Sequence, residues 1–331
     1  MHSDKRLIVF LTILVAALVA TSISIGAESI PIGRALTELF TQPESTYAII
    51  VREIRLPRTI IAMIIGATLG LSGAAMQGLL RNPLASPGLV GSSSGAALAA
   101  VSVLYFGSTA LHTQLVPIAG MVGSLLATLV VYVLAGRNAG ITNLILAGVA
   151  VNALATASLS LLLNLAPSPY AVQEFLLWTM GDLTDRSRND LLMLLPCTLL
   201  GWLLLVGVGR QLNALTLGEN TASSLGIHTQ RLRWRIFLAV SFAVGAAVSI
   251  AGMIGFIGLV VPHLLRPLVK HEPSRLLPVS ALGGAAMLLA ADIGVRLIPT
   301  EQTLKVGVLT ALVGAPFFFY LIVRGRRVYN G

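Results

Sequence analysis

Long apolar segments alternate with short polar ones along the whole chain. Most of the apolar runs approach the roughly 20 residues that a helix needs to cross the hydrocarbon core of a bilayer. The pattern therefore predicts an all-α polytopic membrane protein of about ten transmembrane helices, with residues 1–331 forming a single domain. The predicted spans are 7–25, 59–80, 92–107, 114–135, 141–165, 189–209, 235–254, 256–270, 276–297 and 306–323.

Composition supports a membrane location. The chain is 56% hydrophobic and 11% charged, and its mean hydropathy is +0.88. Soluble domains carry roughly 25% charged residues, so the lipid bilayer is the expected surrounding. The net charge of +9 is typical of a membrane protein with Lys and Arg on its cytoplasmic side, and we expect no nucleic-acid partner.

The distribution of positive charge predicts the orientation. If the N-terminus is inside, 14 of the 22 Lys and Arg residues fall in cytoplasmic segments. Four of the remaining eight lie in one long outer loop, 26–58, and long loops count less in this rule. We therefore expect both termini to be cytoplasmic. Lys5 and Arg6 before the first apolar run would also fit a signal sequence, but Ile25 disfavours cleavage there.

The chemistry of ATP binding, metal binding and catalysis is missing from the sequence. No GxxxxGK[ST] loop is present, and the only lysines are Lys5, Lys270 and Lys305. The five histidines are scattered and Cys197 is the single cysteine, so neither a metal site nor a disulfide is expected. We expect no catalytic residue and no cofactor.

Acidic residues are nearly absent from the predicted spans. Asp292 is the exception, and Arg296 follows four residues later on the same helical face, so the two should pair. An ion-coupled carrier needs acidic groups deep in the membrane, and this chain has little to offer one. A secondary carrier and a membrane-embedded enzyme remain alternatives. The carrier predicts uptake that collapses with a protonophore at constant ATP, and the enzyme predicts turnover by the chain alone.

Two stretches of the sequence resemble each other. The segment from Gly66 to Pro83 aligns with the segment from Gly245 to Pro262, and the two would cross the membrane in opposite directions. This predicts an inverted internal repeat, although chance similarity between Gly/Ala-rich segments is the alternative. Small residues at a spacing of four also predict closely packed helices. They are Gly66, Gly70 and Ala74, and Ala286, Ala290 and Gly294.

The motifs together resemble one known family. LPRTIIAMIIGATLGLSGAAMQGLLRNPLASPGLVGSSSGAALAA, GMIGFIGLVVPHLLR and GVLTALVGAPFFFYLI are similar to the permeases of iron–siderophore, haem and vitamin B12 ABC importers, the FecCD family. The resemblance implies ten transmembrane helices per subunit in a bacterial cytoplasmic (inner) membrane. It also implies a second permease subunit, identical or paralogous, two cytoplasmic ATP-binding subunits, and an extracytoplasmic substrate-binding protein.

The stretch before the last helix departs from the family pattern, and the stretch at 81–83 helps to predict the substrate. The family usually has Glu-Leu-Pro before the last helix, whereas this chain has Thr303, Leu304 and Lys305, so the family pattern does not predict where that helix starts. Family members that act on B12 tend to have Glu-Asn-Pro where this chain has Arg81-Asn82-Pro83. The Arg-Asn-Pro form favours a ferric chelate, siderophore or haem, with vitamin B12 (cobalamin) as the alternative.

The polar stretch 81–95 is predicted to be a turn at the inner mouth of the pathway. Its prolines should stop one helix, its asparagine should bond backbone, and its serines should accept hydrogen bonds from free amides of the next helix. Irregular backbone at membrane depth survives only when it is buried or faces a watery cavity. A plain surface turn is the alternative. The residues are Arg81, Asn82, Pro83, Ser92, Ser93 and Ser94.

The longest inner loop contains a stretch, 215–230, that resembles the family's coupling segment, which docks into a cleft on the ATPase. We expect a short helix at about 219–225, with an acidic residue favourable at its N-terminus and a small apolar face. The residues are Gly218, Glu219, Ala222, Leu225 and Gly226. The following Arg231, Arg233 and Arg235 are expected at the lipid headgroups.

Three arginines fall on the outer side in the predicted topology. They are Arg55, Arg58 and Arg296, and in the family the matching positions meet acidic residues of the binding protein. A guanidinium suits this role because it bonds both oxygens of a carboxylate. As alternatives, Asp292 holds Arg296, and Arg55 and Arg58 anchor at headgroups.

Overall fold

The computed structural model describes residues 2–26, 30–106, 112–136, 140–166, 168–298 and 304–329, and within these ranges the chain is helical without a β-strand. Short irregular links join the helices. The α-helices are α1 (His2–Ser24), α2 (Ile32–Thr41), α3 (Thr46–Ile49), α4 (Leu56–Leu79), α5 (Ser92–Phe106), α6 (His112–Ala135), α7 (Ile141–Asn164), α8 (Pro169–Thr179), α9 (Arg188–Leu205), α10 (Val208–Leu215), α11 (Glu219–Ser224), α12 (Thr229–Ala251), α13 (Ile257–Leu265), α14 (Pro273–Leu297) and α15 (Val306–Tyr329).

The helices confirm an all-α polytopic membrane protein. Among the described residues, seven helices are long and apolar enough to cross a bilayer, and two shorter apolar helices, Ser92–Phe106 and Val306–Tyr320, match further predicted spans. The predicted span 256–270 contains only the nine-residue α13. At 1.5 Å per residue α13 is about 14 Å long, so it reaches only part of the way across.

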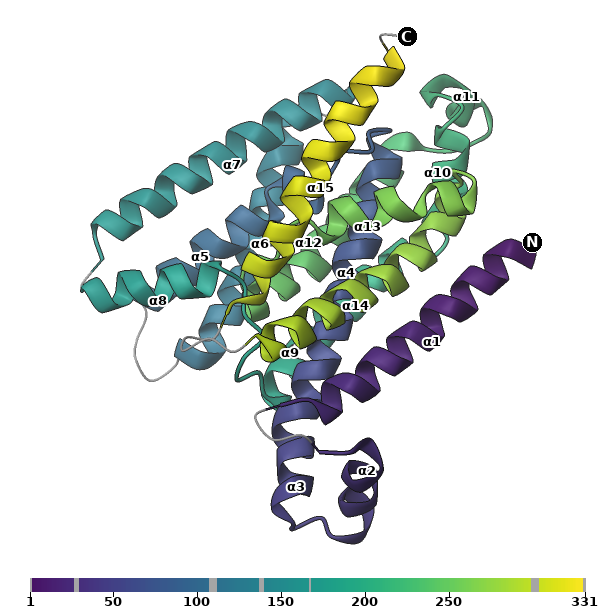
Figure 1. Ribbon diagram of the computed structural model, residues 1–331. Helices are drawn as coiled ribbons and strands as arrows, with labels where there is room; N and C mark the ends of the chain where they lie inside the picture. The colour runs from purple at the N-terminus through teal and green to yellow at the C-terminus, as the bar shows by residue number, and fades with distance from the viewer. Residues whose placement is uncertain are drawn as a thin grey trace.

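Helix α4 is the centre of the bundle (Figure 1). It continues from α3 through a π-helical stretch, Ile50–Arg55, so that one apolar helix runs from Thr46 to Leu79. It packs closely against α14 and α13, and it also contacts α12, α9 and α1. Most of its residues are buried, so α4 is surrounded by protein and not by lipid.

Glycines bring α4 into backbone contact with its neighbours. A Cβ at Gly66 would lie 2.4 Å from the carbonyl oxygen of Gly284, and one at Gly70 would lie 2.0 Å from that of Ser280. The predicted close packing at the α4 glycines is therefore confirmed. On α14 the predicted stripe holds in part, because Ala286 is buried and Ala290 is exposed.

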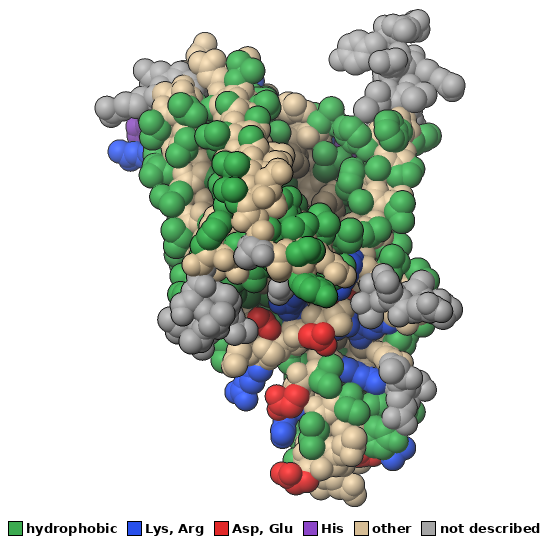
Figure 2. Space-filling view, turned by 90° about the vertical axis from the view of Figure 1, so that its left-hand side faces the viewer, with side chains coloured by type: hydrophobic (Ala, Val, Ile, Leu, Met, Phe, Trp, Pro, Cys, Tyr) green, Lys and Arg blue, Asp and Glu red, His purple; other side chains and the backbone are tan. Residues whose placement is uncertain are grey.

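The flanks of the bundle are apolar. Figure 2 shows hydrophobic side chains covering the side of the molecule, and charged side chains gathered near its lower end. Large apolar side chains are exposed along several helices, among them Leu154 and Leu161 of α7 and Leu203 of α9. Exposed apolar bands of this kind are suited to hydrocarbon.

Helices α2 and α3 form a small lobe that projects from one end of the bundle (Figure 1). The lobe has its own core of Ile30, Ala35 and Val51. Both chain termini and α11 lie toward the opposite end of the bundle in the same view. The lobe and α11 thus mark the two ends of the molecule.

The two stretches of the predicted repeat differ in local structure. From Gly66 the chain is one continuous helix to Leu79, whereas from Gly245 the helix ends at Ala251 and resumes at Ile257. Gly252 has a φ of 70°, in the left-handed region, and ends α12. The sequence similarity is therefore not matched by a shared local structure.

Candidate functional site

The predicted docking arginines surround a buried carboxylate at the lobe end of the bundle. The Nε and Nη2 atoms of Arg58 donate to Oδ1 of Asp292 at 3.0 and 2.8 Å. Nη2 of Arg296 donates to the other oxygen, Oδ2, which confirms the pair predicted from the four-residue spacing. The Asp292 side chain is fully buried, so two guanidinium groups replace the water that its charge would otherwise require.

Two of these arginines also bind the C-terminus of α1. Nη1 of Arg55 donates to the carbonyl oxygens of Ile23 and Ser24, both at 2.9 Å, and Nη1 of Arg296 donates to that of Ser22 at 2.8 Å. The last carbonyl groups of a helix lack partners within it, and cations near that end are favourable. These contacts, which the sequence reasoning missed, fasten α1 to the bundle.

The three arginines differ in accessibility. Arg55 is 6% exposed, and the side chains of Arg296 and Arg58 are 10% and 16% exposed. The docking role stays a prediction, and Arg58 is the member of the group that is best placed to meet a partner.

The turn after α4 has the backbone bond that its asparagine predicts. Oδ1 of Asn82 accepts from the amide of Leu84 at 2.9 Å. Arg81 has a φ of 47° and Gly91 a φ of 75°, so the chain reverses through left-handed residues at both ends of the turn. Pro87 begins a short 3₁₀ helix, Pro87–Val90.

The serines of this turn do not cap the next helix as expected. The hydroxyl of Ser92 donates to the carbonyl oxygen of Pro87 at 3.1 Å. The hydroxyl of Ser94 donates to Oδ1 of Asn152 at 2.6 Å and lies 3.2 Å from the carbonyl oxygen of Gly91. The capping prediction was wrong because the tight turn places carbonyl oxygens, not amides, next to the hydroxyls. Ser92 therefore stabilises the turn itself, and Ser94 joins it to α7.

Asn152 of α7 anchors this turn and was not singled out from the sequence. Its Oδ1 accepts from the Ser94 hydroxyl at 2.6 Å, and its Nδ2 donates to the Gly88 carbonyl at 3.1 Å. Burying unpaired amide groups is costly, so both halves of the side chain are satisfied. An asparagine inside an otherwise apolar span was the available signal.

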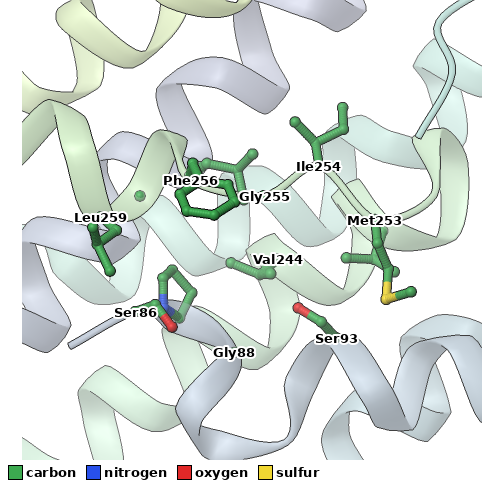
Figure 3. A pocket seen from close by; sticks show the side chains of 13 residues that line it. Ser86, Gly88, Ser93, Val244, Met253, Ile254, Gly255, Phe256 and Leu259 are labelled. Atoms are coloured by element: carbon green, nitrogen blue, oxygen red, sulfur yellow. The ribbon is translucent and has the colours of Figure 1, made fainter. Parts of the chain in front are cut away.

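A mainly apolar cavity of about 350 Å³ separates this turn from the break between α12 and α13. Figure 3 shows Ser86 and Ser93 on one side of the cavity and Ile254–Phe256 on the other. Phe256 has a φ of 66°, an uncommon conformation for an aromatic residue. Irregular backbone between spanning helices is tolerated where it lines a cavity, so this break is a candidate wall of the pathway.

The predicted coupling segment contains the expected helix. Helix α11 spans Glu219–Ser224 between Gly218, with a φ of 106°, and Gly226, with a φ of 82°. Ala222 is fully buried, so its assignment to an exposed apolar face was wrong. Leu225 is 61% exposed and remains available to a partner.

Two arginines that follow α11 are not at the lipid headgroups, contrary to expectation. Nη2 of Arg233 donates to Oε1 of Glu219 at 2.6 Å, and Nε of Arg235 donates to the carbonyl oxygen of Leu204 at 2.6 Å. Arg233 is buried. Their nearest partners are the start of α11 and the end of α9, so they fix the coupling segment against the bundle, and only Arg231 is exposed.

Lys305, in the stretch that departs from the family motif, forms an ion pair with Asp182. Burial alone would raise the pKa of the Asp182 carboxyl, but bonds from Lys305 and Thr184 hold this pKa below its ordinary value. The amide of Asp182 donates to the Ala251 carbonyl at 2.8 Å. The pair therefore joins the start of α15 to the loop before α9 and the end of α12. Thr303 lies outside the described residues.

Comparison with known proteins assigns the family. The FecCD transport family matches residues 13–324. The chain belongs to the FecCD transport family. Within the described ranges of this FecCD protein, no three His, Cys, Asp or Glu side chains come together to hold a metal ion.

Named relatives of this FecCD protein are transport permeases. The chain is 39% identical to the hemin transport system permease protein HmuU of Yersinia pestis, over 97% of this chain and 96% of that protein. It is 37% identical to the Fe(3+) dicitrate transport system permease protein FecD of Escherichia coli, over 97% and 99%. It is 41% identical to the cobalamin import system permease protein BtuC of Halobacterium salinarum, over 87% and 77%.

A solved structure shares the fold. It is assigned to the metal-chelate type of ABC transporters and is in an inward-facing conformation. The two chains superpose with a TM-score of 0.86 at 29% identity, over 97% of this chain and 99% of the other. This FecCD protein is therefore a membrane-spanning permease of an ABC importer, a class that works with ATP-binding and substrate-binding partners.

Proposed function

We propose that this permease carries a ferric chelate, a siderophore or haem, into the cell, with energy from ATP hydrolysed by a separate subunit. The family match over residues 13–324 carries the proposal. The chain has no P-loop of its own, which accords with a separate energy source. Residues 1–331 would form one transmembrane domain, with 215–230 as its coupling segment.

The choice of iron over cobalamin rests on the turn after α4. Relatives named for hemin and cobalamin are similarly close, at 39% and 41% identity, so overall identity does not separate the two substrates. Arg81-Asn82-Pro83 is the form more typical of iron-chelate permeases. Cobalamin is the second candidate.

The test is to purify the chain with its co-expressed neighbours and to offer the associated binding protein labelled haem, a labelled ferric siderophore and labelled cobalamin separately. Retention of an iron chelate, followed by its ATP-dependent uptake into proteoliposomes, supports the proposal. Retention of cobalamin alone would replace it with the second candidate. Uptake that continues without ATP hydrolysis and stops with a protonophore would indicate a secondary carrier, and turnover by the chain alone an enzyme.

The assembly would contain a second permease, identical or paralogous, two ATP-binding subunits on the cytoplasmic side, and a binding protein on the outer side. Its place would be the bacterial cytoplasmic membrane, with both termini inside. The positive charge in the predicted inner segments supports this orientation. The lobe formed by α2 and α3 then projects outward.

Docking of the binding protein is proposed at the arginine group, chiefly at Arg58. Replacing Arg55 or Arg296 would also remove bonds to the end of α1. Arg58→Gln keeps those bonds but removes one partner of the buried Asp292, so binding is measured on protein that is shown to be folded by size-exclusion chromatography. We expect about fivefold weaker binding of the loaded binding protein, since a partly exposed pair contributes about 1 kcal/mol. Arg52→Gln, at an exposed arginine paired with Glu53, is the matched control. Unchanged binding in Arg58→Gln would contradict the assignment.

Coupling is proposed at the end of α11. Leu225→Glu places a charge where an apolar side chain is exposed, and it should abolish transport-linked ATPase stimulation while membrane insertion persists. Leu225→Met keeps the apolar contact and should behave like the unaltered protein. Normal transport by the glutamate variant would remove this segment from the ATPase interface.

A further inference from the structure

A second cavity, of about 580 Å³, lies between the end of α4, α10 and the turn that joins α13 to α14. Three cationic side chains line it: Arg81, Arg266 and Lys270. None of the three has a carboxylate partner among the described residues. The cavity therefore holds positive charge that the described part of the chain does not neutralise.

The acidic group at this cavity is already paired. Glu272 also lines the cavity, but its carboxylate bonds to Nε of Arg275, three residues later in the same turn of helix. It is therefore not free to neutralise the three cations. An anion from outside the chain would find three positive groups converging on one space.

The walls of the cavity are held in place by hydrogen bonds. Nη2 of Arg266 donates to Oε1 of Gln77, and Nε2 of Gln77 donates to the carbonyl oxygen of Leu259 at 3.2 Å. On the opposite wall, Asn213 binds both the hydroxyl and the amide of Ser274 at 2.9 Å. These bonds join α4 to α13 and α10 to α14, so they fix the walls of the cavity around the cationic groups.

The turn that carries Lys270 is strained. Lys270 and His271 have φ values of 54° and 62°, and left-handed backbone is costly for residues other than glycine. Hydrogen bonds from the amides of Lys270 to Pro267 and of His271 to Arg266 keep the turn in this form. Both side chains line the cavity as a result.

We propose that this cavity binds a phosphate group, carried by a lipid headgroup or by a soluble phosphate compound. Guanidinium groups bond two phosphate oxygens at once, and lysine adds a point charge. The cavity lies where α4 ends and α14 begins, so it is at one end of two spanning helices. Leu264 and Leu268, close by in sequence, are exposed and offer apolar surface to acyl chains, which favours the lipid.

The experiment measures binding to the full-length purified chain by native mass spectrometry. Phosphatidylglycerol, phosphatidylcholine, inorganic phosphate and ATP are titrated separately. The cavity variant is Arg81→Gln with Lys270→Gln, which leaves the Arg266–Gln77 bond intact. The matched control is Arg210→Gln with Arg231→Gln, which removes the same charge from exposed positions toward the same end. We expect one tightly held anionic ligand and about 30-fold weaker binding in the cavity variant, from about 1 kcal/mol for each cation removed.

The separate titrations distinguish a lipid headgroup from a soluble phosphate compound. Retention of phosphatidylglycerol that phosphate and ATP do not displace assigns the site to a lipid, and displacement by either assigns it to a soluble phosphate; both support the proposal. Equal weakening in the cavity variant and the control would show general surface charge and overturn it. Absence of binding to the unaltered chain would overturn it as well. Co-purification of the ATP-binding subunit is measured in parallel; its loss in the cavity variant with phosphate binding unchanged would also overturn the proposal, because the cations would then belong to a protein interface.

Discussion

Asp292 is the residue on which the lobe end of the bundle depends most. Its buried carboxylate accepts bonds from Arg58 of α4 and from Arg296 of its own helix. Arg296 in turn binds the end of α1. One carboxylate thus orders side chains that hold three helices together. A buried charge of this kind is stable only while its partners are complete.

Asp292→Asn should therefore destabilise the protein strongly. The substitution keeps the shape of the side chain but leaves two largely buried guanidinium groups without their counter-charge, at a cost of about 3 kcal/mol. Thermal unfolding in detergent measures the effect. Glu53→Gln, which breaks the exposed pair with Arg52, is the control and should cost no more than about 1 kcal/mol. Similar midpoints for the two variants would contradict this view of Asp292.

At the scale of single residues the sequence predicts local partners and misses distant ones. The Asp292–Arg296 pair follows from helical spacing alone. Arg58 lies 234 residues from Asp292 in sequence, and no local pattern connects them. The arginine bonds to the α1 carbonyls are equally non-local, because they require knowing that α1 packs against α14. The sequence reasoning accordingly considered a structural role for Arg296 through Asp292, but it missed the bonds of Arg58 to Asp292 and of Arg55 to α1.

Among the elements, the contact between α4 and α13 depends on two glycines. A Cβ at Gly73 would lie 1.8 Å from the carbonyl oxygen of Gly258, which no real structure tolerates. Close backbone approach of this kind is a main source of helix association in membranes.

Gly73→Ala should consequently lower the yield of folded protein and its thermal midpoint, because α13 must move away from α4. Fluorescence-detected size-exclusion after heating is a suitable measurement. Gly33→Ala in α2, where an added Cβ meets nothing within 4 Å, should be neutral or slightly stabilising, since alanine favours helix. A Gly73→Ala protein as stable as the Gly33→Ala control would show that α13 adapts freely.

Helices were predicted well and their ends less well. Apolar runs of spanning length leave little choice of structure in a bilayer, which is why each predicted span contains a helix. The short α8 and the lobe helices α2 and α3 carry no such signal. Whether a serine hydroxyl accepts or donates depends on which backbone groups the turn brings near it, and for Ser94 on Asn152 of a distant helix.

For the whole molecule, the two ends of the bundle should be accessible from opposite sides of the membrane. With Cys197 replaced by Ala, Ser93→Cys lines the cavity beside the turn and Phe40→Cys is exposed on the lobe. A membrane-impermeant thiol reagent should label Ser93→Cys from the cytoplasmic side and Phe40→Cys from the outside. Ser92 is unsuitable because it is fully buried. Labelling of both from one side would refute the topology.

The Asp182–Lys305 pair should make the lobe end of the bundle sensitive to acid. The pKa of Asp182 is lowered in the folded protein, so its contribution to stability is present above the unfolded pKa of about 4 and is lost as the pH falls through the folded value. Lys305→Gln should cost about 1 kcal/mol at pH 7. The difference in thermal midpoint between the unaltered protein and Lys305→Gln should shrink only below about pH 4. A difference that is constant from pH 7 to pH 3 would exclude the pair as its cause.

The unbroken helix from Thr46 to Leu79 has a mechanical consequence. Its 34 residues make a rod about 51 Å long, well beyond the roughly 30 Å hydrocarbon core. One end of the rod carries the lobe and Arg58, and the other carries Gln77, next to the turn at Arg81. A displacement of the lobe along the helix axis therefore has two possible outcomes. Either the whole helix moves and displaces the turn at its other end, or the helix bends at the π-helical stretch Ile50–Arg55. The flexibility of these six π-helical residues therefore determines how much of a displacement of the lobe is transmitted to the turn at the other end of the helix.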